Sequence, residues 1–316
     1  MDWTQRLRLR NLQMLLSLAQ TGNMSQTAAA LSTTQPALSK WLKELEDDVG
    51  LPLFERHARG LRPTPYGESM IAHARRIEAH LDTARDDMQA MREGGSGLVV
   101  IGTSGASAAD TVPLAVTSLL QRLPKAQVRL VESTMNLLMA QLARGEVDIV
   151  VGRSAPELQD GQMRAEALYM EPIHFVTRPR HPLFELAEPG WNDLQAYRWI
   201  VWPRGTPIRN TLESALNAAG RSMPGDCVES NSVILNLTLL NHSNMIGVAS
   251  HRTARRLEQL GALRILPLRL AGFGSVSMYW RDDGFGRTAV SAALDALRRA
   301  GTRSVEEGAG GAGEPG

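Results

Sequence analysis

The stretch MSQTAAALSTTQPALSKWLKEL, residues 24 to 45, decides the fold of the N-terminal part of this chain. It fits two short amphipathic helices joined by a turn at Ser32 and Thr33. Along the second helix, apolar residues recur at spacings of four, three and four, which places them on one face of a helix. This face is expected to be buried, and it consists of Leu38, Leu42, Leu45 and Val49.

The opposite face of the second helix is polar, and its first turn is expected to be exposed. Thr34 precedes the helix, where its hydroxyl can cap free N–H groups. Pro36 in the first turn costs little, because its missing donor has no intrahelical partner there. In a helix-turn-helix, the second helix enters the major groove with its N-terminus first. Gln35 and Ser39 are therefore candidates for base edges, and Lys40 and Lys43 are candidates for phosphates. An ordinary pair of surface helices is the alternative, because helix-turn-helix patterns have few fixed positions.

Residues 51 to 67, LPLFERHARGLRPTPYG, predict a short hairpin after the two helices. The segment alternates poorly and contains three prolines together with Arg56, Arg59 and Arg62. At this position a hairpin would be the wing of a winged helix-turn-helix, with arginines that meet phosphates or a narrow minor groove. An ordinary basic loop is the alternative.

Residues 65 to 93 predict one long helix that links the N-terminal domain, residues 1 to 64, to the rest of the chain. Its apolar residues alternate at spacings of four and three, which is the pattern of a helix that pairs with another helix. Burial in the core of one domain is the alternative. The many charged residues elsewhere on this helix favour dimerisation, which would match a DNA site with inverted half-sites. The predicted dimerisation residues are Met70, Ala74, Ile77, Leu81, Ala84 and Met88, with Met91 next in the stripe.

Residues 94 to 300 alternate between short apolar strands and helices, which predicts an open parallel α/β sheet. The alternation occurs in two sets, one from Leu98 to Val151 and one from Trp199 to Leu260. Ile173 to Pro182 lies between the two sets, and Leu263 to Leu268 and Val276 to Trp280 follow the second set, which would allow two chain crossings between two lobes. This arrangement resembles a periplasmic-binding-protein-like clamp. Residues 301 to 316 are rich in glycine, and we expect a disordered tail there.

A two-lobed clamp binds its ligand where strand ends and helix N-termini converge. Hydroxyls and free N–H groups at helix starts suit an anion or a polyhydroxy compound. Ordinary helix capping is the alternative for each serine or threonine taken singly. Arg209, Asn231 and Ser250 are further possibilities at these turns. The predicted contacts are Thr103, Ser104, Ser107, Ser133, Thr134, Arg204, Thr206 and Ser232.

The N-terminal stretch from Leu9 to Gly67 resembles the LysR-type transcriptional regulators. Thr27 stands where that family usually has a second alanine, and Thr34 stands for the commoner serine. The matching residues are Ala28, Leu31, Thr34-Gln35-Pro36-Ala37-Leu38-Ser39, Leu45-Glu46, Gly50, Leu53-Phe54-x-Arg56, Leu61-x-Pro63-Thr64 and Gly67.

The resemblance implies an α/β protein with a winged helix-turn-helix, a linker helix and a two-lobed effector domain. It implies a homodimer or homotetramer that regulates transcription at an inverted-repeat operator, with RNA polymerase as a further partner. Residues 55 to 68, ERHARGLRPTPYGE, look closest to a subgroup that includes regulators of sugar uptake and of aromatic-acid breakdown. The expected effector is therefore a sugar, a small carboxylate or an aromatic acid.

Composition agrees with a globular chain and limits its chemistry. The 316 residues are 43% hydrophobic and 21% charged, with a net charge of +1. The first 66 residues carry eight Lys and Arg against six Asp and Glu, an excess of two that is weak evidence for a nucleic-acid partner. Cys227 is the only cysteine, so neither an intrachain disulfide nor a thiolate metal cluster is expected. Because the sequence shows no signal peptide and no long apolar run, we expect a cytoplasmic protein with no membrane partner. We also expect no cofactor and no metal.

Catalytic motifs are missing from the sequence. Gly102-Thr103-Ser104-Gly105 is not the G-x-S-x-G elbow, because Ala106 occupies the last position. The sequence contains no Walker loop, HExxH, CxxC or dinucleotide G-x-G-x-x-G after a strand. A binding role is therefore preferred. The alternative is a small-molecule-binding or catalytic α/β protein without regulatory DNA binding.

Overall fold

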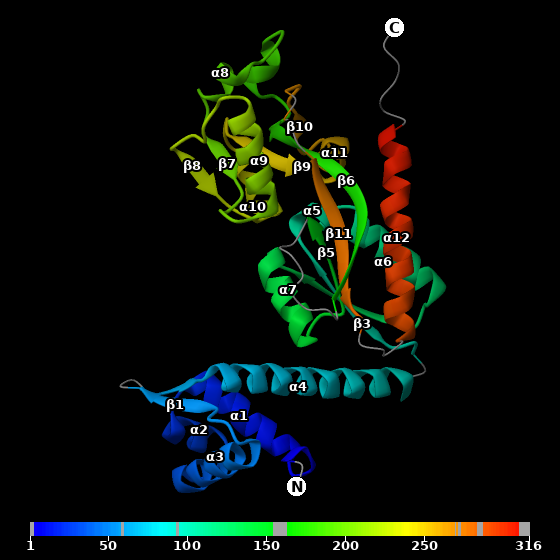
Figure 1. Cartoon of the computed structure of the whole chain (residues 1–316). Coiled ribbons are helices and arrows are strands. Elements are labelled where there is room, and N and C mark those ends of the chain that lie inside the picture. Colours follow the sequence, from blue (N-terminus) through cyan, green and yellow to red (C-terminus); the bar gives the residue numbers. More distant parts are fainter. Residues whose placement is uncertain are drawn as a thin grey trace. The chain divides into compact units, whose positions relative to one another are not determined.

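The structure of the chain is a computed structural model that describes residues 3–57, 60–92, 95–153, 163–268, 270, 273–282 and 287–309. The chain divides into two units, Met1–Asp86 and Asp87–Gly316. Figure 1 shows the elements of each unit along the chain. Within the described residues, no helix combines the length and the apolar character needed to cross a membrane.

The first unit is a winged helix-turn-helix, as the sequence predicts. A short 3-10 helix, Trp3–Gln5, precedes it. Its core contains the buried leucines of the third helix together with Ile71 and Ala74 from the long helix. The elements are α1 (Leu9–Thr21), α2 (Met24–Ala30), α3 (Gln35–Val49), the antiparallel strands β1 (Phe54–His57) and β2 (Gly60–Pro63), and α4 (Pro65–Arg92).

Polar side chains fix the corners of this unit. Asn23 caps α2 by accepting hydrogen bonds from the N–H groups of Ser25 at 2.9 Å and Gln26 at 3.2 Å. The Glu46 carboxylate accepts from the N–H groups of Leu53 at 2.7 Å and Phe54 at 3.0 Å, which holds the start of the β1–β2 hairpin against α3. The family-like glutamate in the Leu45-Glu46 pair therefore positions the wing.

Thr27 is fully buried, although the family usually has alanine at this position. Its hydroxyl donates to the carbonyl of Asn23 at 2.9 Å and lies 2.6 Å from the hydroxyl of Thr21. Because both polar neighbours are in reach, the departure from the family pattern leaves no buried hydroxyl unsatisfied.

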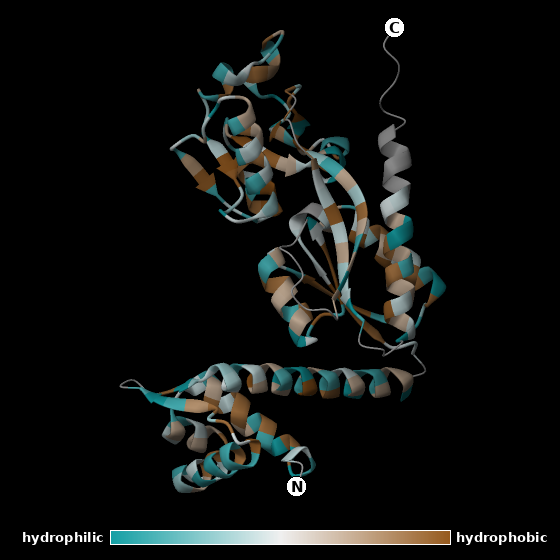
Figure 2. Ribbon diagram, in the orientation of Figure 1, coloured by the Kyte–Doolittle hydropathy of each residue, from teal (hydrophilic) through white to brown (hydrophobic). Residues whose placement is uncertain are grey.

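The first lobe of the second unit is one half of a long mixed sheet (Figure 1). Helices α6 and α12 cover one face of this half, and α7 covers the other. In Figure 2 the long central strands of this sheet show brown segments interrupted by white and teal ones. The elements are β3 (Leu98–Thr103), the short α5 (Gly105–Ala108), α6 (Thr111–Arg122), β4 (Gln127–Glu132), α7 (Met135–Arg144), β5 (Ile149–Arg153) and α12 (Thr288–Ala309).

The second lobe is the other half of the sheet. Helices α8 and α9 pack on one face of it, and α10 and α11 pack on the other. A short 3-10 helix, Pro182–Glu185, follows the entry of the chain into this lobe. The other elements are α8 (Trp191–Leu194), β7 (Trp199–Val201), α9 (Pro207–Ala218), β8 (Cys227–Glu229), α10 (Val233–Asn241), β9 (Ile246–Ser250), α11 (His251–Gln259) and β10 (Arg264–Ile265).

Two antiparallel strands join the lobes; the second contains the expected segment Val276 to Trp280, while the first overlaps the expected segment Ile173 to Pro182 only at its end. They are β6 (Met163–Thr177) and β11 (Phe273–Arg281). The sheet order is β4-β3-β5-β11-β6-β9-β7-β8, so this pair stands at its centre. The first part of β6 pairs with β11, and its last residues pair with β9.

The structure corrects the predicted tail. Helix α12 continues through Gly301 to Ala309, so the first residues of the expected disordered segment are helical. The glycine content of the tail obscured this continuation, whereas Ala293, Leu297 and Ala300 keep the helix against the sheet up to its last described side chains. Residues 310–316 lie outside the described residues.

Candidate functional site

The first turn of α3 is exposed, as its sequence predicts. The hydroxyl of Thr34 accepts a hydrogen bond from the N–H of Ala37 at 3.4 Å, so the helix begins at Gln35. Thr34, Gln35 and Pro36 are all exposed, while Ser39 is half-buried at the edge of the same face. Ser25 of α2 donates to the Gln35 side chain at 3.4 Å. This turn can therefore enter a groove without any rearrangement of the unit.

Lysines follow this turn along the exposed face of α3. Lys40 lies 3.7 Å from Glu44, and both side chains are largely exposed. Exposed pairs of this kind contribute little, so the ammonium is available to a phosphate. Lys43 is also exposed. The face can therefore carry two phosphate contacts beside the polar residues of the first turn.

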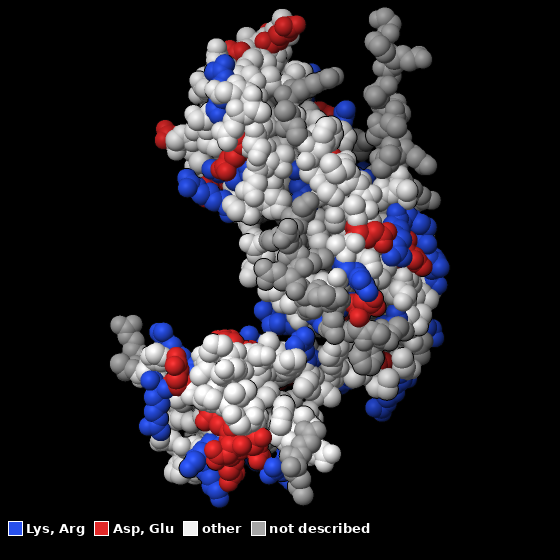
Figure 3. Space-filling model, viewed as in Figure 1, with Lys and Arg blue, Asp and Glu red and all other residues white. Residues whose placement is uncertain are grey.

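The β1–β2 hairpin carries the predicted arginines. Arg56 and Arg62 are exposed, and Arg62 stands opposite Glu55 across the two strands. Arg59 lies outside the described residues. Figure 3 shows basic side chains along the hairpin and a mixture of acidic and basic side chains over α3. The positive charge is thus local to the wing and to part of α3, in line with the small net charge of the N-terminal residues.

The apolar stripe of α4 is buried at one end and exposed at the other. Ala74 is fully buried in the core of the first unit, and Met70 packs against that core. The exposed fractions then rise to 40% for Ile77, 45% for Leu81 and 59% for Met88. Ala84 is also exposed. Of the predicted dimerisation residues, Met70 and Ala74 therefore pack within the first unit, and only the later residues of the stripe are exposed.

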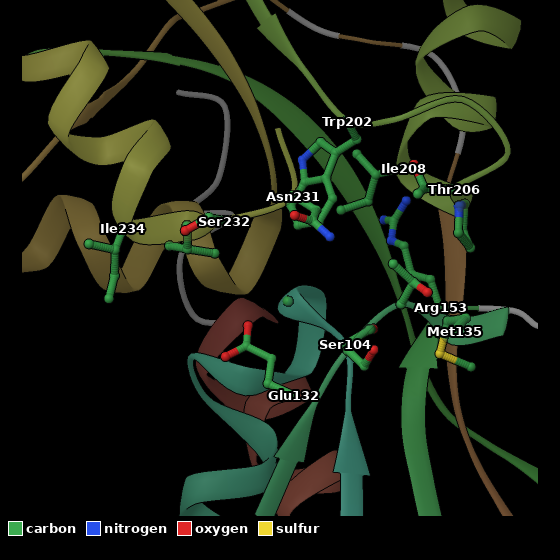
Figure 4. Close-up of a pocket in the computed structure, with 15 residues that line it drawn as sticks. Ser104, Glu132, Met135, Arg153, Trp202, Thr206, Ile208, Asn231, Ser232 and Ile234 are labelled. Carbon is green, nitrogen blue, oxygen red and sulfur yellow. The ribbon is translucent and has the colours of Figure 1, made fainter. Parts of the chain in front are cut away.

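A cavity of about 300 Å³ lies between the two lobes of the second unit. The first lobe contributes the carboxyl ends of β3, β4 and β5, and the second lobe contributes the starts of α9 and α10 (Figure 4). The lining residues are Ser104, Gly105, Glu132, Ser133, Thr134, Met135, Arg153, Trp202, Thr206, Pro207, Ile208, Asn231, Ser232, Val233 and Ile234.

The structure brings most of the predicted effector contacts together at this cavity. The residues that line it as predicted are Ser104, Ser133, Thr134, Thr206 and Ser232, together with Asn231.

Other predicted contacts do not line the cavity. Thr103 and Ser107 are buried, with their hydroxyls 2.9 Å apart, and Ser107 donates to the carbonyl of Val151 at 2.8 Å. Arg204 is exposed outside the cavity. The hydroxyls of Thr103 and Ser107 hold the start of α5 to the sheet. A serine or threonine after a strand can take such a structural role as well as a ligand-binding one.

Arg209 and Ser250 also serve the framework. The Arg209 guanidinium is buried and lies 2.5 Å from Glu213 and 3.6 Å from Glu229. Ser250 is buried and donates to the hydroxyl of Thr253 at 3.0 Å. Neither side chain faces the ligand space.

Sequence reasoning missed Arg153, which lines the cavity from the carboxyl end of β5. In Figure 4 its guanidinium extends toward Thr206 and Ile208. It donates to the backbone carbonyl of Glu171 at 2.6 Å and to the hydroxyl of Thr211 at 3.4 Å. Its position directly after a buried strand was the available signal, because residues at that place face the ligand crevice of an α/β sheet.

A buried polar network continues from Arg153 into the hinge between the lobes. The Glu171 carboxylate on β6 accepts from the N–H of Arg252 at 3.0 Å. The Arg252 side chain crosses to the first lobe, where it donates to the hydroxyl of Thr111 at 2.8 Å and lies over the ring of Tyr169. Burial raises the pKa of Glu171 and lowers the pKa of Arg153, while the charges of the two groups oppose these shifts.

Metal ligands do not gather in the part of the chain that the structure describes. No group of three or more His, Cys, Asp or Glu side chains there could hold an ion. Cys227 is half-buried as a free thiol on β8.

Two family models match the chain. The model described as "Bacterial regulatory helix-turn-helix protein, lysR family" matches residues 9–68, and "LysR substrate binding domain" matches residues 92–302. The chain is 32% identical over 297 residues to the HTH-type transcriptional regulator GbpR of Azospirillum brasilense, covering 93% of this chain and 87% of that protein. It is 29% identical to the regulator PcaQ of Agrobacterium fabrum, covering 94% of this chain and 96% of that protein.

Solved structures share the fold. Full-length CbnR in complex with its target DNA matches with a TM-score of 0.64 at 20% identity, covering 93% of this chain and 100% of that chain. A full-length OxyR variant from Pseudomonas aeruginosa matches with a TM-score of 0.59 at 22% identity, covering 92% and 97% of the two chains.

Proposed function

The chain belongs to the LysR family of DNA-binding transcriptional regulators, which carry an effector-binding domain, and we propose that it reads an inverted-repeat operator under the control of a small molecule bound between its two lobes. The exposed first turn of α3 is the observation that carries the DNA-binding part. Recognition in the major groove requires a helix start that is accessible. The start of α3 is capped by Thr34 and is not covered by the rest of the first unit.

On DNA, each side chain of this surface has a role that follows from its chemistry. Gln35 can donate to and accept from a base edge, and Ser39 lies one turn further along the same face. Thr34 holds the helix start, and Pro36 sets its first turn. Lys40, Lys43 and the wing arginines contact phosphates, which position the unit without reading sequence.

The cavity between the lobes is the effector site. Ser104, Ser133, Thr134, Thr206, Asn231 and Ser232 present hydroxyl and amide groups there. Because lining residues come from both lobes, a bound ligand stabilises one arrangement of the lobes over another. Its differential affinity for the two arrangements then sets how far the operator complex or the contact with RNA polymerase changes.

Self-association completes the proposed regulator. The exposed stripe of Ile77, Leu81, Ala84 and Met88 on α4 pairs with the same stripe of a second copy, to give a homodimer or a homotetramer. A two-fold axis through such a pair places two copies of α3 on inverted half-sites.

Selection from a random double-stranded DNA library tests the proposed function. The full chain should enrich one inverted repeat, and the charge-reversal variant K40E/K43E should lose retention on every sequence. Failure of the wild-type chain to retain any duplex at low ionic strength would contradict the proposal.

The relatives are transcriptional regulators, and we propose that this chain likewise binds its effector without transforming it. A regulator of chromosomal genes acts in the cytoplasm, where we expect this one. Any compound that stabilises the protein should be recovered unchanged after prolonged incubation, as chromatography would show. Turnover at a constant rate would instead favour the enzyme alternative.

A further inference from the structure

The cavity between the lobes contains a buried guanidinium with an unused donor. The Arg153 side chain is 2% exposed, and its Nε has no hydrogen-bond partner among the described residues. The nearest carboxylate oxygen, Oε1 of Glu171, lies 3.9 Å from Nε and also lacks a hydrogen-bond partner there. This separation is too long for a hydrogen bond, so two buried groups of opposite charge are left incompletely satisfied.

Helix starts add positive potential at the same cavity. Helices α7, α9 and α10 begin at its wall, where Thr134, Thr206 and Ser232 precede their first turns. Neither Thr134 nor Thr206 makes a side-chain cap, so the first N–H groups of α7 are open to a ligand, whereas α9 begins with Pro207 and offers its first N–H at Ile208. The positive ends of these helices favour an anion in the space between them.

The remaining wall of the cavity is apolar. The indole N–H of Trp202 already donates to the carbonyl of Val248 at 2.9 Å, so its ring is left for packing against a ligand. Met135 of the first lobe and Ile208 of the second lobe, both buried, also line the cavity. Glu132 stands at the exposed rim, where its charge is solvated and can accept a hydrogen bond from a ligand hydroxyl.

We propose that the effector is a small organic acid whose carboxylate binds the Arg153 guanidinium and the adjacent helix starts, while its carbon skeleton packs against Trp202 and Ile208. This inference rests on the proposed function and specifies the ligand of its effector site. The ring or chain of a small acid suits a cavity of about 300 Å³. A neutral sugar would leave Glu171, whose Oε1 lies 3.9 Å from Nε of Arg153, as the only counter-charge in contact with this guanidinium among the described residues.

Glu171 acts as an internal competitor for the same guanidinium. A ligand carboxylate that binds Nε draws Arg153 away from Glu171, whose other oxygen stays bonded to the N–H of Arg252. Because Arg153 also contacts Thr211 on α9 of the second lobe, this exchange alters a contact between the lobes. Binding of the ligand carboxylate therefore changes the contacts of Arg153 in the hinge between the lobes.

Matched pairs of acids and amides test the charge requirement. Isothermal titration of the full chain uses benzoate against benzamide, phenylacetate against phenylacetamide, and glucuronate against glucuronamide. At least one acid should bind about tenfold more tightly than its amide, as the loss of a charge-assisted hydrogen bond predicts. Equal binding within every pair, or no binding by any acid, overturns the inference.

Substitutions then assign the charge requirement to Arg153. The variant R153Q should lose the preference for the acid, whereas the control R204Q, which changes an exposed arginine outside the cavity, should keep it. Retention of the preference by R153Q contradicts the assignment.

The variant E171Q keeps the shape of its side chain and an acceptor for Arg252 but removes the competing charge, so acid affinity should rise several-fold. If R153Q does not fold, E171Q still tests whether the ligand carboxylate binds Arg153. An unchanged or weaker acid affinity in E171Q counts against the proposal.

Retention of duplex DNA by the same proteins separates two kinds of failure. If the wild-type chain retains DNA but prefers no acid, only the ligand class is wrong. If it retains no DNA, the proposed regulatory function fails, whatever the titrations show.

Discussion

Gln35 is the side chain with the clearest expected effect on sequence recognition. Its exposed amide stands in the first turn of α3, where it can make paired hydrogen bonds with one base. Gln35→Ala should weaken binding to the selected operator by about 1 to 3 kcal/mol and relax the preference at one position of each half-site. Repeating the selection with this variant measures both effects. Gln13→Ala, an exposed change on α1, is the control, and unaltered specificity in Q35A would refute the base contact.

Lys40 should behave differently, because a phosphate contact has no sequence preference. Lys40→Ala should lower affinity on all duplexes and reduce the slope of log affinity against log salt by about one unit. Fluorescence anisotropy with one operator and one unrelated duplex, over a range of salt concentrations, gives the slope. A slope equal to that of the wild type would mean that Lys40 stays paired with Glu44 on DNA.

At the scale of single residues, the sequence predicted local roles better than tertiary ones. Thr34 as a cap and Leu38 as core follow from neighbours along one helix, and the structure confirms both. Thr103 and Ser107 carry hydroxyls at the end of a strand or just after it, as ligand-binding residues of an α/β sheet often do. Their hydroxyls, however, bond to each other. Arg153 was missed because its role depends on Glu171 and Thr211, which are distant in sequence.

At the scale of elements, α4 carries the exposed apolar residues that we propose to pair with a second copy. Leu81→Arg places a charge in the centre of the exposed part of the stripe, where a second helix would bury it. Sedimentation should then show a smaller species than the wild type. Ala72→Arg, an exposed change nine residues away and half a turn round the helix, should leave the assembly intact. An L81R variant with the native sedimentation coefficient would dispose of the proposed pairing.

The join between β6 and α11 should make stability depend on pH. Nε2 of His174 lies 2.8 Å from Nδ1 of His251, and burial, with the neighbouring charges of His251 and Arg255, lowers the pKa of His174 to about 4. An unfolded histidine titrates near pH 6.5, so between that pH and about 4 the unfolded chain takes up a proton that the folded chain refuses. Stability from this group is therefore present above pH 6.5 and lost as the pH falls.

Replacing the buried imidazole should reduce this dependence. The Tm of His174→Gln should fall less than that of the wild type between pH 7 and 4.5. His242→Gln, which changes an exposed histidine of the same lobe, serves as the control. Parallel curves for H174Q and the wild type would show that His174 does not titrate as described.

Element boundaries could be predicted where one physical signal dominates. Helix α4 begins at Pro65 as expected, because proline suits a first helical turn. Only the end of the long strand β6 was expected, within the segment Ile173 to Pro182, because the alternation before it is interrupted; residues 163–172 pair with β11 and residues 173–176 pair with β9. Helix α12 outlasted the expected boundary at Gly301 because tertiary packing overrides the low helix propensity of glycine.

At the scale of the whole molecule, a two-fold assembly should be sensitive to the phase of its operator. An insertion of about 5 base pairs between the half-sites rotates one of them to the opposite face of the duplex, whereas about 10 base pairs restores the phase. Affinity should drop sharply for the first operator and recover largely for the second. Gel retardation with both operators checks this, and equal affinity for both would indicate that the half-sites are bound independently.

The order of the chain through the second unit has a consequence for how the protein is made. The first lobe begins at β3 but needs α12, the last element of the chain, to cover one face of its sheet. A nascent chain can therefore complete its first unit early, while the first lobe keeps apolar surface uncovered until α12 has been synthesised. Emergence of α12, rather than emergence of β3, β4 and β5, therefore marks the moment at which the first lobe can close its core.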